Sequence, residues 1–245
     1  MSTKVVRGKR LRATRVDRCG LPLAGPKATL VTKGFVSVKY QNVWKDASDL
    51  EQENADGELC VTDRTAPQLK WATVEAVLCD VDIELFNMFT GNKMILNYAQ
   101  KPTGFVQGKT VNTEIGVGLE LWSGTAGDDC DVPLDDSVLE AEDPIREYGY
   151  WLAPAIVEAT LGDIEIGASV ATFTMTGRAV SAPMWGKGPY DVVAQNAANL
   201  AGRLLQPIGK DEPWLMDTVT IEPPAVTDGA VPLVLPTPYF GPVTP

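Results

Sequence analysis

The most concentrated reactive groups in this 245-residue chain are carboxylates between residues 128 and 147. The run consists of Asp128, Asp129, Asp131, Asp135, Asp136, Glu140, Glu142, Asp143 and Glu147. Two carboxylates held across a cleft can hydrolyse glycosides, and carboxylate oxygens bind hard cations such as Ca²⁺. The run lacks the Asp-x-Asp/Asn-x-Asp/Asn-Gly spacing of a calcium loop, and dense acidic runs are typical of solvated loops. We therefore predict an acidic loop at about 123–147 with no catalytic or metal-binding residue.

The sequence contains few of the other residue types and motifs that catalysis commonly uses. The chain contains no histidine, which excludes the serine, cysteine and metal hydrolases that depend on it. The four cysteines, Cys19, Cys60, Cys79 and Cys130, form no CxxC pair, so we expect free thiols and no zinc site. We predict that the protein is not an enzyme and binds no cofactor.

A glycine-rich segment, WGKGPY, occupies residues 185–190. It lacks the spacing of a phosphate-binding loop. Gly186, Gly188 and Pro189 instead predict a tight turn between Trp185 and Tyr190. Because aromatic residues are enriched at interfaces, the segment is either a structural turn or a subunit contact.

The net charge of −11 is unevenly distributed along the chain. The first 18 residues carry +6 and the remainder −17. The acidic balance argues against binding DNA through its phosphates, since that requires Lys and Arg. A basic end on an acidic body favours attraction between copies, and a solvated basic strand is the alternative. The basic residues of this end are Lys4, Arg7, Lys9, Arg10, Arg12, Arg15 and Arg18.

The elements that would position these groups are mostly strands. The sequence predicts strands near residues 9–17, 36–41, 70–79, 114–122, 171–176 and 215–221, several of them marked by two-residue alternation. In the second of these we expect Val36, Val38 and Tyr40 on the buried face, and in the fourth we expect Gly116 and Gly118 on the outward face. The apolar and aromatic segment 148–158 is expected to dock on the core. Residues 45–58 are acidic and predict a solvated loop.

One short helix is expected after the third strand. Asp82 has the side chain of an N-cap, Glu84 suits the positive start of a helix, and Gly91 suits its left-handed end. The fold class is therefore mainly β: an antiparallel β-sandwich or partial barrel with one flanking helix, long loops and extended terminal arms. We assign residues 1–222 to this domain and the proline-rich residues 223–245 to an extended C-terminal arm.

Several stretches in order resemble the major tail protein of phages with long, non-contractile tails, especially those of actinobacteria. They are RLRATRVDRCGLPLAG at 10–25, GFVSVKY at 34–40, ADGELCVTDR at 55–64, LCDVDIELFNMFTGN at 78–92 and WGKGPYDVV at 185–193. The resemblance implies a tail-tube fold and stacked hexameric rings through which DNA passes without specific binding. It also implies contacts with the tape measure, tail terminator and distal tail proteins, and location in the virion tail after synthesis in the host cytoplasm.

The repeated contacts of such a tube lead to a specific hypothesis about subunit interfaces. Head-to-tail contacts commonly use strand edges, long loops and terminal arms. The candidates are Arg10, Arg12, Arg15, Asp128, Asp129, Asp131, Asp135, Asp136, Glu140, Glu142, Trp185, Gly186, Gly188, Pro189 and Tyr190. Deleting residues 128–143 should leave a folded protein that no longer polymerises, measured by sedimentation; undiminished polymers would contradict the hypothesis.

Two other functional classes stay open at this point. One is a head decoration or tail-terminator protein. The other is a carbohydrate-binding β-sandwich, for which the six tryptophans could stack on sugar rings. The tryptophans are scattered along the sequence, which favours packing in a core or an interface.

Overall fold

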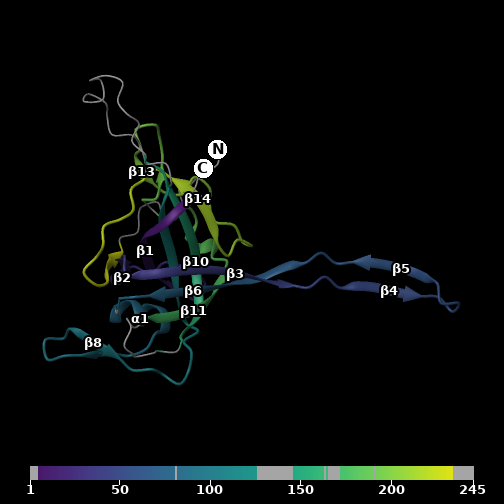
Figure 1. Ribbon diagram of the computed structural model, residues 1–245, viewed down its shortest axis with the longest axis horizontal. Helices are drawn as coiled ribbons and strands as arrows, with labels where there is room; N and C mark the ends of the chain where they lie inside the picture. The colour runs from purple at the N-terminus through teal and green to yellow at the C-terminus, as the bar shows by residue number, and fades with distance from the viewer. Residues whose placement is uncertain are drawn as a thin grey trace, which may run out of the picture.

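The computed structural model describes residues 5–80, 82–125, 146–162, 164, 172–189 and 191–233. Strands dominate this part of the chain, and α1 (Ile83–Thr90) is its one α-helix (Figure 1). The strands are β1 (Val5–Asp17), β2 (Gly25–Thr32), β3 (Phe35–Lys45), β4 (Asp49–Glu53), β5 (Leu59–Arg64), β6 (Gln68–Leu78), β7 (Met94–Leu96), β8 (Pro102–Phe105), β9 (Ile115–Thr125), β10 (Tyr148–Leu161), β11 (Phe173–Val180), β12 (Val193–Ala194), β13 (Ala201–Gly202), β14 (Leu215–Val219) and β15 (Val231–Leu233).

A nine-stranded sheet forms the body of the protein. Its order is β15-β2-β1-β9-β10-β11-β6-β3, and β14 pairs with β10 beside this path. Every pairing is antiparallel. The predicted fold class, a mainly β antiparallel fold with one short helix, is confirmed. No helix in the described ranges is long and apolar enough to cross a membrane.

Both faces of the central strand β9 are buried. On one face, Val117, Leu119 and Leu121 join the larger hydrophobic cluster. On the other face, Trp122 joins a second cluster, which also contains Tyr150 and Trp185. The expectation that Gly116 and Gly118 lie on an outward face is therefore wrong, because the segment after β11 covers that face.

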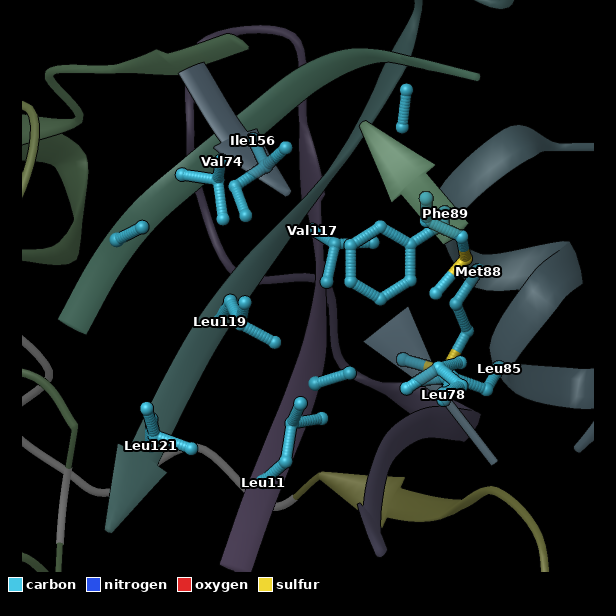
Figure 2. Packing of buried hydrophobic residues seen from close by; sticks show 14 of the residues in the cluster. Leu11, Val74, Leu78, Leu85, Met88, Phe89, Val117, Leu119, Leu121 and Ile156 are labelled. Atoms are coloured by element: carbon cyan, nitrogen blue, oxygen red, sulfur yellow. The ribbon is translucent and has the colours of Figure 1, made fainter. Parts of the chain in front are cut away.

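Helix α1 closes the larger cluster, and the predicted caps are confirmed. The Asp82 carboxylate accepts hydrogen bonds from the backbone N–H groups of Glu84 and Leu85, at 2.9 and 3.1 Å. Gly91 ends the helix with φ +68°. Figure 2 shows Phe89 beside Val117 and the side chains of Leu85 and Met88 near Leu78. The helix thus covers one end of the sheet with its apolar side.

Two predictions made for the stretch from residue 34 to residue 64 are wrong in detail. A register shift between Phe35 and Ser37 puts Phe35, not Val36, against the core, and Val36 is 59% exposed. The shift is a β-bulge, which moves one side chain to the opposite face. The acidic segment 45–58 is not a loop throughout, because residues 49–53 form strand β4.

The first part of the proline-rich segment, up to Leu233, runs along the edge of the sheet. Strand β15 pairs with β2. The backbone N–H of Thr227 donates to the Val31 carbonyl, and the backbone N–H of Val31 donates to the Thr227 hydroxyl oxygen, both at 3.0 Å. The Glu84 carboxylate accepts a hydrogen bond from the backbone N–H of Ala230 at 2.5 Å and forms an ion pair with Lys27 at 2.5 Å. This part of the predicted arm therefore extends the sheet by one short strand.

Candidate assembly surface

A two-stranded ribbon projects from the body of the protein. Strands β3 and β6 leave the sheet together and continue as β4 and β5, which reach far beyond the other elements (Figure 1). At about 3.3 Å per residue, the ribbon extends roughly 30 Å beyond the end of β3. Every residue of β4 and β5 is exposed.

Local hydrogen bonds hold the ribbon in shape at its base and its tip. At the base, the backbone N–H of Thr65 donates to the Ser48 carbonyl at 3.0 Å, and the two hydroxyl oxygens are 2.7 Å apart. At the tip, the side-chain oxygen of Asn54 accepts from the N–H groups of Asp56 and Glu58. Gly57 takes φ +81° in this turn, a conformation that suits glycine. Asp56 and Gly57 thus lie in the tight turn at the tip of the ribbon.

The ribbon carries apolar side chains that nothing in the described chain covers. Leu50, Leu59 and Val61 are 65%, 58% and 49% exposed. The register pairs Leu50 with Asp63 and Gln52 with Val61, which places the apolar side chains of Leu50 and Val61 on one face. An isolated two-stranded ribbon is only marginally stable in water. A partner that buried this face would therefore stabilise the ribbon.

A second projecting hairpin lies on the opposite side of the molecule. It is formed by β7 and β8, and its turn is fixed by Asn97, whose side-chain oxygen accepts from the N–H groups of Ala99 and Lys101 (Figure 1). Ile95 and Leu96 are 48% and 45% exposed, and Tyr98 at the turn is 99% exposed. The base is anchored by Phe105, whose ring lies 5.2 Å from that of Phe86 on α1.

Arg12, one of the predicted interface residues, is part of a buried polar cluster inside the chain. Its guanidinium contacts both oxygens of Glu120, at 2.6 and 2.7 Å, and both oxygens of Asp191, at 2.9 Å. Glu120 is fully buried and also accepts a hydrogen bond from the Tyr150 hydroxyl at 2.8 Å. The Arg12 guanidinium also lies over the Trp122 ring. These contacts join β1, β9, β10 and the segment after β11.

The charges of this cluster are strongly coupled. Burial raises the pKa of Glu120, and the contacts with Arg12 and Tyr150 oppose that rise. Burial lowers the pKa of Arg12, but the two carboxylates outweigh it, so the net pKa lies well above the ordinary value. Because one guanidinium faces two carboxylates, the cluster fastens the segment around Asp191 to the sheet.

Trp185 is also buried inside the chain. Its indole N–H donates to the Pro154 carbonyl at 2.6 Å, and the side chain is 1% exposed. Gly186 follows with φ +57°, and the N–H of Gly188 donates to the Trp185 carbonyl at 2.9 Å, so the chain makes the predicted turn directly after Trp185. The Gly188-Pro189 peptide is cis. The monomer thus buries the Trp185 side chain in its second hydrophobic cluster.

Of the remaining interface candidates, the structure describes Arg10 and Arg15. Arg10 is half-buried and donates to the Lys9 carbonyl at 2.8 Å, and Arg15 donates to the side chain of Asn87 on α1. Tyr190 and the seven acidic candidates, Asp128, Asp129, Asp131, Asp135, Asp136, Glu140 and Glu142, lie outside the described residues. The role of these residues at an interface stays a prediction.

Sequence reasoning predicted the acidic segment 45–58 as solvated but missed that it belongs to a projecting hairpin. It also missed the second hairpin, and it missed Glu120 and Asp191 as partners of Arg12. The alternation of Leu59 and Val61 was a usable signal for β5. The partners of Arg12 had no comparable signal, because Glu120 and Asp191 are separated from it by 108 and 179 positions in the sequence.

Among known proteins, no family model matches this chain, and a search of curated proteins finds no match.

Proposed function

We propose that this chain is a self-assembling structural subunit of a phage tail tube, which forms stacked rings around a channel for DNA. The observation that carries self-assembly is the projecting ribbon, whose apolar side chains Leu50, Leu59 and Val61 are exposed in the single chain. Exposed apolar patches mark surfaces that bind other proteins. The assignment to a tail tube rests in addition on the resemblance of the ordered sequence stretches described above.

A purely monomeric function accounts poorly for the ribbon. A ribbon whose strands are exposed along their whole length adds nothing to the hydrophobic clusters of the body. Ordering a residue costs on the order of 1–2 kcal/mol of backbone entropy. A contact made with another copy would recover this cost, and repeated head-to-tail contacts produce rings or filaments.

Imaging of the purified protein tests this proposal. We expect negative-stain electron microscopy of concentrated protein to show rings or tubes, and we expect the protein in isolated virion tails. A single closed ring that never stacks would favour a tail-terminator protein instead. A folded monomer at high concentration that is also missing from virion tails would overturn the proposal.

A further inference from the structure

The two projecting hairpins carry opposite charge. Residues 49–64, which form the acidic ribbon, hold six acidic side chains and one arginine, a net charge of −5. Residues 93–111 comprise the β7–β8 hairpin and the segment after it, and they are together called the basic hairpin. They hold three lysines and no acid, a net charge of +3. The lysines are Lys93, Lys101 and Lys109, and all are exposed.

These charges are largely unused within the described chain. The one ion pair in the acidic ribbon joins Arg64 to Asp49 at 3.5 Å, with both side chains mainly exposed. No ion pair among the described residues involves the three lysines of the basic hairpin. Both surfaces are therefore free to meet a charge of opposite sign.

Both hairpins also present apolar side chains beside their charges. The acidic ribbon exposes Leu50, Leu59 and Val61. The basic hairpin exposes Ile95, Leu96, Tyr98, Val106 and Val111. An interface that combines an apolar contact with charges of opposite sign obtains affinity from the first and orientation from the second.

The positions of the hairpins exclude a contact between them in one molecule. Figure 1 shows the ribbon at one end of the longest axis and the β7–β8 hairpin at the other side of the body. Two complementary surfaces at opposite ends of one chain can meet only between copies. Such a contact is head-to-tail, and it repeats until it closes a ring or extends a filament.

We propose that the acidic ribbon of one copy docks against the basic hairpin of the next copy. The partner is thus a second copy of this chain, and the inference rests on the proposed function. Strand edges at both hairpins can add backbone hydrogen bonds to the contact, because β4, β5, β7 and β8 each pair with a single strand. Assembly through this contact weakens as salt screens the charges.

Charge reversal tests the contact. We expect Glu51→Lys with Glu53→Lys and Glu58→Lys to raise the protein concentration needed for assembly about tenfold or more. Lys93→Glu with Lys101→Glu and Lys109→Glu should have the same effect. The protein that carries all six changes should return to within about threefold of the wild type. Assembly is measured by sedimentation, and folding by circular dichroism.

The matched control reverses three exposed acids elsewhere: Glu114→Lys, Asp211→Lys and Glu222→Lys. It changes the net charge as much as the ribbon variant does, and assembly should stay at the wild-type concentration. Folded triple variants that assemble like the wild type, or a six-site variant no better than either triple, would overturn the docking contact but not the proposed function. A wild type that never assembles would overturn both.

Cross-linking tests the contact without any substitution. A carbodiimide joins a carboxylate to a lysine amine that lies against it. In assemblies grown from a mixture of ¹⁵N-labelled and unlabelled protein, we expect mixed-isotope links between Glu51, Glu53 or Glu58 and the lysines of the basic hairpin. Assemblies in which the ribbon is linked only to lysines outside residues 93–111 would contradict the proposal.

Discussion

Replacing Arg12 with alanine is expected to lower the free energy of unfolding by about 3–5 kcal/mol, because it leaves a buried carboxylate without its counter-charge. Glu120 is fully buried, and Arg12 supplies its charged partner through two contacts of 2.6 and 2.7 Å. Without the guanidinium, the Tyr150 hydroxyl is the one donor to this carboxylate among the described residues. Chemical denaturation monitored by tryptophan fluorescence measures the change.

Asp191→Asn is the matched control for this prediction. The Asp191 side chain in this ion pair with Arg12 is 52% exposed, so water can replace much of the contact. We expect a loss of about 1 kcal/mol or less. Equal losses for the two variants would show that the exposed ion pair, and not the buried one, determines the stability of the cluster.

The loss caused by Arg12→Ala should depend on pH. Burial already raises the pKa of Glu120, and removing Arg12 removes the main effect that opposes the rise. The folded state then binds the proton more tightly than the unfolded state, whose Glu pKa is about 4.3. The protonated Glu120 therefore contributes to stability in full below the unfolded pKa, and this contribution is lost as the pH rises through the raised folded pKa.

Denaturation curves between neutral pH and about pH 4 check this sign. We expect the deficit of Arg12→Ala relative to the wild type to shrink as the pH falls. The combination of Arg12→Ala with Glu120→Gln should show less of this dependence, because glutamine does not titrate. A deficit that grows on acidification would contradict the account of Glu120.

The local features of the fold were predictable because their causes lie within a few residues. The Asp82 carboxylate reaches the N–H groups of Glu84 and Leu85, so the helix start is visible in the sequence. The positive φ of Gly20, Gly57 and Gly91 likewise follows from turns whose partners are near neighbours. The alternation over residues 70–79 also predicts the strand that the structure has as β6, in which Ala72, Val74 and Ala76 are buried.

What the sequence did not reveal depends on contacts between distant segments. The burial of Glu120 and Gly118 requires the segment after β11 to cover the second face of β9, and β9 alone shows only an alternation of apolar and small or charged residues. The bulge that exposes Val36 arises from the register of β3 on β6. Strand periodicity specifies which residues share a face, and tertiary packing decides whether that face meets water.

The same dependence on contacts between distant segments explains why the sequence did not reveal that two predicted interface residues, Arg12 and Trp185, are held inside the single chain. In the single chain Arg12 binds the segment that follows Trp185 through Asp191, and Trp185 binds β10 through the Pro154 carbonyl. The exposed hairpins, by contrast, have compositions that suit solvated loops. A charge run alone does not distinguish a solvated loop from a surface that another copy covers.

Replacing Trp185 with alanine is the second change with a large expected effect, a loss of about 3–5 kcal/mol in the free energy of unfolding. The substitution empties a buried site in the second hydrophobic cluster and removes the donor to the Pro154 carbonyl. Met184→Ala is the matched control, since Met184 is the preceding residue and is 42% exposed. We expect the control to change stability by no more than about 0.5 kcal/mol.

A substitution at Gly118 tests the contact between β9 and the Trp185 indole directly. A Cβ built at Gly118 lies 2.4 Å from the Trp185 ring and 3.0 Å from the Pro154 carbonyl oxygen. Gly118→Ala should therefore destabilise the wild type by about 1–3 kcal/mol, although alanine ordinarily stabilises a strand relative to glycine. In the Trp185→Ala background the ring is gone, so the cost of the added methyl group should fall, because two residues in contact do not act additively. Equal costs in both backgrounds would mean that the indole does not rest on β9, and the second face of the strand would then need another cover.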